Sequence, residues 1–491
     1  MIGEYSFEMC RSLLTVTLGS GITALEPNAF AGCYKLVEVI DNSNLGASSD
    51  PSSSAYIMET VLAIHTGASL IDEVDGMLFI THEGRNLLLG CVKDPGAYLV
   101  LPDRYNNQDY EVYNEAFNNV KRAVSVTVGS GVTYISDSAF TGCASIVEVV
   151  NRSSLDIEAG MLSNGGIAAG AKVVVSESVL EDYQQFLFYT DDEGVHYLVA
   201  YTGDGIEITL PNYFYEETYV VGAHAFANHR TIERLIIGEG VVAIDDYAFD
   251  GCISLYEVTI PETVVYIGTS AFRGCAISLI NIPDSVEVIA DFAFSGNFAL
   301  IKVIIGSGLS ELGRGAFADC NALHTIEITV VNKTYRSINN VIYSKDMKCL
   351  ILYPLGLTDE SFIVPEEVEV IGVDAFANNK YLVSLVIGDN VKTVSANALY
   401  CMEALTELTI GASVESIDSY AMAFVTGLRT IVWKSTSAVL EDYAFSGTVG
   451  IKKVYFAGST AEWRNQYCET FGNDILGSID VEVVYNYDAE S

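Results

Sequence analysis

Residues 264–275 read VVYIGTSAFRGC, and this short stretch decides the fold. Its mark is the pair Ala271-Phe272, which a Gly-Cys turn follows after one residue. The pair, or a close variant of it, recurs along the whole chain. Identified by their aromatic or apolar residue, the marks are Phe7, Phe30, Phe117, Phe140, Phe226, Phe249, Phe272, Phe294, Phe317, Phe376, Leu399, Met422 and Phe445. Successive marks are 23 residues apart, or 22 from Phe272 to Phe294, except where three longer segments intervene. So regular a spacing predicts an architecture of repeated units.

Each unit contains two short apolar stretches that suit strands. The first places Leu255, Val258 and Ile260 before Pro261, which fits a strand with inward side chains that a proline ends. The second stretch covers residues 264–267. Because one unit cannot bury its apolar edge alone, neighbouring units must stack and share a core. The period lies within the 20–29 residues typical of leucine-rich-repeat coils. The sequence therefore predicts a β-rich α/β solenoid, a leucine-rich-repeat superhelix of 22–23-residue coils with inserted β-hairpins.

The three longer segments separate Phe30 from Phe117, Phe140 from Phe226 and Phe317 from Phe376. Each is expected to hold a β-hairpin, with one strand ending at 75–79, 193–197 or 340–343 and a second apolar strand after a polar turn. Marks 109 or 110 residues apart also indicate a tandem super-repeat in the N-terminal half. The predicted parts are coils at 1–40, 112–151, 221–331 and 371–456, inserts at 41–111, 152–220 and 332–370, and a C-terminal cap or tail at 457–491.

The amino-acid composition argues against some classes of binding partner. The 491 residues include 64 Asp and Glu against 25 Lys and Arg, a formal net charge of −39. A protein of this charge repels phosphates and anionic bilayers, so nucleic acid is not an expected partner. Half of the residues are hydrophobic, which predicts a folded chain. No uncharged apolar run is long enough to span a bilayer, so no membrane insertion is expected.

The cysteines form one structural column. Those at the third position after a mark are Cys10, Cys33, Cys143, Cys252, Cys275 and Cys320. We interpret them as small apolar side chains that fill a tight interior position, in preference to disulfides or metal ligands. The six histidines are scattered, and no Cys-x-x-Cys pair occurs. We therefore predict no catalytic, cofactor-binding or metal-binding residues, no cofactor, and no enzyme activity.

The strand surface that points away from the core is the candidate partner-binding face. In the central coils it is predicted to carry Arg234, Ile236, Glu257, Thr259, Leu279, Asn281, Lys302, Ile304, Thr325 and Glu327. A glycan platform would favour stacked aromatic rings, whereas aliphatic residues interleaved with charges favour a protein partner. The alternative is that β-branched residues occur there only because they suit strands.

The pattern V-x-x-I-G-x-x-A-F-x-G-C-x-x-L-x-x-V-x-I-P resembles the BspA-type leucine-rich repeat of bacterial surface proteins. The hairpin inserts and the segment 455–463 are similar to recurrent features of that family. The resemblance implies adhesion, or binding of host or neighbouring-cell macromolecules, by proteins of host-associated bacteria and some mucosal protists. It supplies no catalytic residues.

We therefore expect a non-enzymatic bacterial cell-surface protein that binds a protein or glycoconjugate ligand through its solenoid surface. Two alternatives remain: a structural spacer that presents a missing N-terminal domain, and a hydrolase that acts through the hairpin inserts. Residues 2–7 read like 267–272, so the chain begins within a unit. We expect upstream sequence with an export signal, and a location at the cell surface or outside the cell.

Overall fold

The computed structural model describes residues 1–53, 55–468 and 470–488. It divides the chain into two compact units. The first holds Met1–Thr190 with Val199–Gly203, and the second holds Asp191–Leu198 with Asp204–Ser491. The division passes through the strand β15 (His196–Tyr201). Both units consist of stacked coils, so the predicted solenoid is confirmed.

In the first unit, coil strands pair in parallel on two sides of the coils. On one side lie a sheet of β1 (Thr15–Leu18), β2 (Glu38–Asp41) and β3 (Ala63–His65), and a sheet in the order β12 (Val173–Val175), β11 (Glu148–Asn151), β9 (Ser125–Val128) and β7 (Tyr98–Val100). On the other side the order is β10 (Val132–Ile135), β8 (Tyr110–Val112), β6 (Arg85–Cys91), β5 (Met77–His82) and β4 (Asp72–Val74). The unit also contains β13 (Glu181–Tyr183), β14 (Phe186–Thr190) and the 3₁₀ helix η1 (Asn164–Gly166).

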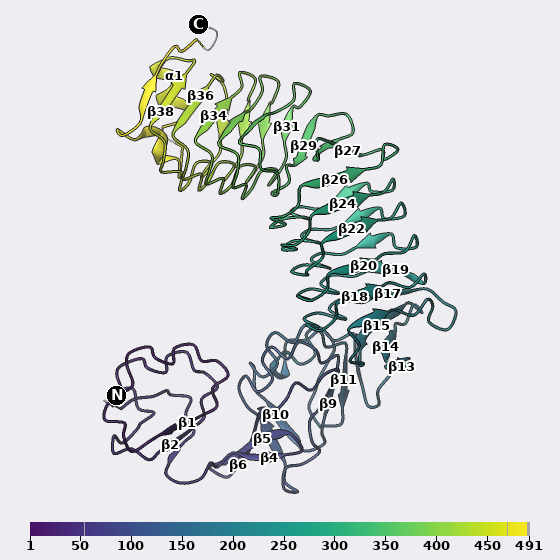
Figure 1. The fold of residues 1–491 in the computed structure, drawn as a ribbon. Coiled ribbons are helices and arrows are strands. Elements are labelled where there is room, and N and C mark those ends of the chain that lie inside the picture. The colour runs from purple at the N-terminus through teal and green to yellow at the C-terminus, as the bar shows by residue number, and fades with distance from the viewer. Residues whose placement is uncertain (54, 469, 489–491) are drawn as a thin grey trace. The chain divides into compact units, whose positions relative to one another are not determined.

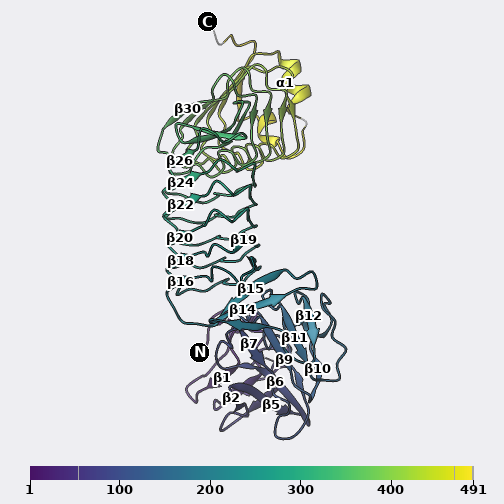
Figure 2. The same cartoon turned by 90° about the vertical axis from the view of Figure 1, so that its right-hand side faces the viewer.

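In the second unit, each coil again contributes one strand to either side (Figures 1 and 2). One side carries β16 (Glu207–Thr209), β18 (Arg234–Ile236) and β20 (Glu257–Thr259), then β22 (Leu279–Ile282), β24 (Lys302–Ile305) and β26 (Thr325–Ile328), then β30 (Ser361–Ile363), β32 (Ser384–Val386), β34 (Glu407–Ile410), β36 (Thr430–Trp433), β38 (Lys453–Phe456) and β39 (Glu482–Val484). The other side carries β15, β17 (Tyr219–Val221), β19 (Val241–Ile244), β21 (Tyr266–Ile267), β23 (Val288–Ile289) and β25 (Glu311–Leu312), then β27 (Tyr335–Ile338), β28 (Val341–Ser344), β29 (Cys349–Leu352), β31 (Val370–Ile371), β33 (Thr393–Val394), β35 (Ser416–Ile417) and β37 (Val439–Leu440).

The marking phenylalanines form the spine of the core. Phe249 and Phe272 are fully buried, and their rings stack in parallel with centroids 5.0 Å apart. The Phe249 N–H also donates to the carbonyl oxygen of Ala271 in the next coil, at 2.7 Å. Each mark thus joins its coil to the next through both a ring contact and a main-chain hydrogen bond.

A left-handed residue lies two positions before most marks and two positions after most of them. Around Phe249 these residues are Tyr247 (φ 58°) and Gly251 (φ 71°). The second position explains the glycine of the Ala-Phe-x-Gly pattern, because glycine adopts positive φ without a steric penalty. Where glycine is absent, asparagine often replaces it, as at Asn378 (φ 63°). The two reversals bend the chain tightly around the phenylalanine and place the flanking side chains on the outer edge of the turn, here called the turn edge.

Antiparallel hairpins occur in the inserts as predicted. β5 pairs with β4 and β6, and β28 pairs with β27 and β29. In the second insert the predicted position of the hairpin is wrong, because it is displaced by one turn along the chain. Gln184 and Gln185 turn the chain between β13 and β14, whereas residues 193–194 lie in the turn that follows β14. The first part of each long insert continues the solenoid, because β3 and β12 extend the parallel ladders of the preceding coils. The outer boundaries of the inserts stay predictions.

Buried carboxylates tether the hairpins of the first unit to its coils. Glu38 on β2 and Glu148 on β11 are fully buried, 110 residues apart in the super-repeat. The Ser69 hydroxyl donates to Glu38 at 2.6 Å, and the Ser178 hydroxyl donates to Glu148 at 2.9 Å. Each serine belongs to the segment that leads into a hairpin, so the same contact fixes both connections.

The helix α1 (Thr460–Gln466) begins with a capping box between Ser459 and Glu462. In the described residues it is the one α-helix, and η2 (Asp474–Gly477) follows it, so helix contributes little to the expected α/β class. No described helix is long and apolar enough to cross a membrane. The predicted cap at 457–491 includes residues 469 and 489–491, which lie outside the described residues.

Candidate binding surfaces

The predicted strand face lies on the outer side of β18, β20, β22, β24 and β26. Its residues are exposed or half-buried, whereas the alternating residues, such as Leu235 and Val303, are buried. Two aliphatic side chains are unusually open, since Ile236 is 51% exposed and Leu279 is 49% exposed. This face therefore presents apolar side chains to solvent from regular parallel strands.

Ion pairs lie on the same strands as those aliphatic side chains or on neighbouring ones. The Arg234 guanidinium lies between Glu207, at 3.2 Å, and Glu257, at 3.0 Å. Farther along, the Lys302 ammonium lies 2.8 Å from Glu327. Both cations of the face are thus paired with neighbouring strands, which leaves the face without a free cation among its predicted residues.

The structure brings the predicted residues together in two groups. β18 pairs with β20, and β22 pairs with β24 and β26, but β20 and β22 belong to different sheets. The break between β20 and β22 coincides with the single 22-residue spacing. Ile277 stands two residues after Cys275, whereas the equivalent Leu255 stands three residues after Cys252. Asn297 bridges the shortened turn, accepting from the Ile277 N–H at 3.2 Å.

The turn edge is a second surface, which the sequence analysis missed. Its left-handed residues place aromatic rings from successive coils next to one another. His224 stacks on Tyr247 with centroids 5.0 Å apart, and Tyr420 stacks on Tyr443 at 5.3 Å. An aromatic residue two positions before successive marks was the available signal in the sequence.

A cavity of about 780 Å³ opens on the turn edge of the second unit, where the insert with β27, β28 and β29 interrupts the coils. The segment Leu352–Leu355 replaces a normal turn there. Tyr353 takes the place of a marking phenylalanine, since it is buried, stacks on Phe376 at 5.2 Å and donates its N–H to Ala375 at 2.8 Å. The Tyr353 hydroxyl donates to Asp359 at 3.0 Å, and burial raises the pKa of Tyr353.

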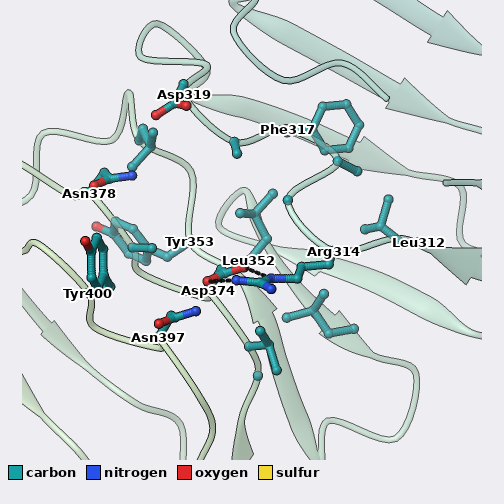
Figure 3. Close-up of a pocket in the computed structure, with 18 of the residues that line it drawn as sticks. Leu312, Arg314, Phe317, Asp319, Leu352, Tyr353, Asp374, Asn378, Asn397 and Tyr400 are labelled. Atoms are coloured by element: carbon teal, nitrogen blue, oxygen red, sulfur yellow. Dashed lines mark hydrogen bonds and ion pairs between the residues drawn. The ribbon is translucent and has the colours of Figure 1, made fainter. Parts of the chain in front are cut away.

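An ion pair crosses this cavity (Figure 3). The Nε atom of Arg314 lies 2.6 Å from Oδ2 of Asp374, and the Arg314 side chain is half exposed. This contact raises the pKa of Arg314. Asn378, Asn397 and Tyr400 also line the cavity. The cavity therefore combines aromatic rings, amides and a paired charge, a composition typical of small-molecule sites.

The cysteine column has a polar role in addition to its packing role. The six cysteines of the column form no disulfide, and the Cys252 and Cys320 thiols donate to the main-chain oxygens of Phe226 and Phe294 at 3.1 and 3.2 Å. Burial raises the pKa of both thiols to about 12, so they stay protonated donors. Among the described residues no group of three or more His, Cys, Asp or Glu side chains could hold a metal ion.

The family comparison identifies the repeat. A family model described as the BspA type leucine rich repeat region matches residues 1–52, 104–169, 220–348 and 357–471, in six copies. The matched residues make up well over half of the chain. No curated protein matches it.

Solved structures of bacterial leucine-rich repeat proteins are also similar to this chain. A protein from Eubacterium ventriosum is 23% identical, with 56% of this chain and 77% of that chain covered and a TM-score of 0.45. The pneumococcal vaccine antigen PcpA is 17% identical, with 63% and 99% covered and a TM-score of 0.41. A leucine rich cell surface protein from Faecalibacterium prausnitzii is 20% identical, with 82% and 98% covered and a TM-score of 0.40. At these identities none of the three bears on what this chain binds.

Proposed function

The chain belongs to the BspA-type leucine-rich repeat family, and from this premise we propose that it is a non-enzymatic binding protein of a bacterial cell surface. It holds a protein partner of a host or neighbouring cell on the outer face of β18–β26. The surface location in this proposal follows from the resemblance of its repeats to those of bacterial surface proteins.

The observation that carries the proposal is the pair of exposed aliphatic side chains, Ile236 and Leu279, on a face that also carries ion pairs. Protein interfaces combine apolar side chains that lose water with polar groups that stay hydrated. An isolated exposed aliphatic residue would need no explanation. Here two of them lie on one side of the coils, on β18 and β22 with β20 between them, where a single partner surface can cover both.

The chemistry of the face suits binding rather than bond cleavage. It brings together paired charges, hydroxyl groups and aliphatic side chains on rigid strands. Because Arg234 and Lys302 are already paired, the face offers a partner no concentrated positive charge. We therefore expect complementarity of shape and apolar area to dominate affinity, with a weak dependence on salt.

The test is binding of the full chain to immobilised extracellular-matrix proteins, mucin and whole bacterial cells. A double variant, Ile236→Asp with Leu279→Asp, places two charges at the centre of the face. It should weaken binding to the recognised member of the panel at least tenfold. Val265→Asp is the matched control, because Val265 is 44% exposed and lies next to β21 on the other side of the coils.

Two results would refute the proposal. One is binding no stronger than that of heat-denatured protein across the whole panel. The other is equal binding by the native chain and the double variant, with both chains giving the same circular dichroism spectrum. The second result would show that the partner binds to another surface of the solenoid.

A further inference from the structure

The cavity on the turn edge contains a row of main-chain donors that the repeat leaves without acceptors. In the preceding coil, the N–H groups of Phe292, Phe294 and Gly296 donate to carbonyl oxygens of the next coil at 3.0, 2.8 and 2.8 Å. The equivalent N–H groups after one more repeat belong to residues 315, 317 and 319. No acceptor for these three groups occurs in the part of the chain that the structure describes.

The reason is the insert with β27, β28 and β29. A normal coil would follow Phe317 and place its carbonyl oxygens against these donors. Instead the chain leaves to form the hairpin, and the regular ladder resumes only when Tyr353 donates to Ala375. The donors of Gly315, Phe317 and Asp319 therefore face the cavity that they line.

Further polar groups surround the same space. Within the described residues the side-chain amides of Asn378 and Asn397 make no hydrogen bond, and both residues line the cavity. The carboxylates of Asp319 and Asp374 add acceptors, and Arg314 adds donors. A ligand that fits must accept several hydrogen bonds from one wall and donate to the carboxylates of another. Hydroxyl groups do both.

Aromatic side chains supply the remaining wall. Tyr400 lines the cavity (Figure 3), and its ring makes an edge-to-face contact with Phe424 at 5.6 Å. Such a ring offers an apolar face on which the C–H groups of a sugar ring can pack. The volume of about 780 Å³ lies in the range of sites for small ligands.

We propose that this cavity binds a neutral oligosaccharide, with its hydroxyl groups on the donors of 315, 317 and 319 and one ring against Tyr400. A purely apolar ligand would leave the three N–H groups buried without partners, which costs free energy. An anionic ligand would meet the carboxylates of Asp319 and Asp374, only one of which has Arg314 as a partner. This site is separate from the strand face and does not depend on the proposed function.

An extended peptide fits the donors less well. Gly315 (φ 59°) and Asp319 (φ 57°) are both left-handed, so the three N–H groups follow a curved turn instead of a straight strand edge. The carbonyl groups on one side of an extended peptide lie on a line, whereas hydroxyl groups surround a sugar ring. A turn-forming peptide is therefore the competing occupant that the experiment includes.

The test is calorimetric titration of the full chain with lactose, N,N′-diacetylchitobiose and maltotriose. 3′-Sialyllactose is the anionic counterpart, and a blocked Ala-Phe-Asp-Gly peptide is the competing occupant. At least one neutral sugar should bind with a dissociation constant in the millimolar range or below. Asn397→Gly, which suits the positive φ of this position, and Tyr400→Ala should each weaken that binding at least tenfold.

Tyr381→Ala is the matched control, since Tyr381 is 43% exposed in the same unit and does not line the cavity. It should leave sugar binding unchanged, as should Ile236→Asp with Leu279→Asp on the strand face. Thermal melting checks that each variant is folded. The proposal fails if no neutral sugar binds, if only the peptide or 3′-sialyllactose binds, or if binding survives in folded Asn397→Gly and Tyr400→Ala.

Discussion

The thiol of Cys252 donates a hydrogen bond to the main-chain oxygen of Phe226 in the preceding coil, with 3.1 Å between the sulfur and oxygen atoms. Other residues make the same contact at equivalent positions. The Asn297 amide donates to Phe272 at 2.8 Å, and the Thr448 hydroxyl donates to Met422 at 2.6 Å. Small donors thus occupy much of the column and cysteine is the commonest of them, although Val120, Met402 and Val425 stand at the same position without a side-chain donor.

This relationship predicts a difference between two substitutions of similar size. Cys252→Val removes the donor and should reduce the free energy of unfolding by about 1 kcal/mol, because one buried hydrogen bond is lost. Cys252→Thr keeps a donor, as Thr448 does, and should be closer to the wild type. Chemical denaturation of the full chain measures both. Equal stability of the two variants would show that the column acts through packing alone.

Phe272→Ala should remove a central member of the phenylalanine spine. The ring is fully buried between Phe249, at 5.0 Å, and Phe294, at 5.3 Å, so its loss should cost about 3–5 kcal/mol. Hydrogen exchange should accelerate in the coils of Phe249 and Phe294 and stay slow around Met422, because stability in a solenoid is mainly between neighbours.

Phe298→Ala is the control for that experiment, since Phe298 belongs to the next coil and is 65% exposed. It should leave exchange unchanged. If Phe272→Ala instead accelerated exchange uniformly across the second unit, the coils would unfold as one cooperative body, contrary to the prediction.

The contact between the buried Glu38 and the half-buried His65 predicts a pH dependence in the first coils. Burial opposes ionisation of Glu38, but hydrogen bonds from Ser69, Leu70, His65 and Thr15 outweigh it and lower its pKa. The contact with Glu38 raises the pKa of His65, whose Nε2 atom lies 3.0 Å from the carboxylate. Glu38 therefore stabilises the fold above its ordinary pKa, and this stabilisation is lost as pH falls through its lowered pKa.

The contribution of His65 to stability depends on pH in the opposite direction. Its stabilisation is complete below its ordinary pKa and is lost as pH rises through the raised value. Protection of β3 against hydrogen exchange, corrected for intrinsic rates, should therefore be greatest at mildly acidic pH and fall in both directions. His65→Gln should abolish the fall on the alkaline side and keep the fall on the acidic side. A pH profile in that variant identical to the wild type would contradict the assignment.

Trp463 should hold the C-terminal cap on the last coils. It is buried on α1, makes an edge contact with Trp433 at 5.3 Å and donates its indole N–H to Leu476 at 3.2 Å. Trp463→Ala should cost about 3–5 kcal/mol and accelerate exchange in β36 and β38 first. Phe471→Ala, at a ring that is 66% exposed, should have little effect on thermal melting. Unchanged exchange in β38 would show that the cap does not stabilise the coils.

The sequence predicted the placement of the core with little ambiguity. The marks, the inward strand residues and the cysteine column all recur with the coil period. Phe249 stacks on Phe272 of the next coil, and Cys252 donates to Phe226 of the preceding coil. The hairpins were harder to place. In the second insert the sequence analysis named residues 193–197 alone, and only strand pairing shows that residues 184–185 close the hairpin of β13 and β14.

By itself, the sequence determined the solenoid, because a period of 22–23 residues repeats the same local contacts from coil to coil. Only the tertiary structure decided where the regular contacts between successive coils are interrupted. The cavity beside Arg314 and Asp374 brings together Phe292 and Phe424, which lie far apart in the chain. Its donors at 315, 317 and 319 look like any other coil in the sequence. They lack acceptors only because the chain after β26 forms the hairpin of β27 and β28 instead of the next turn, so the space beside them stays open as the cavity.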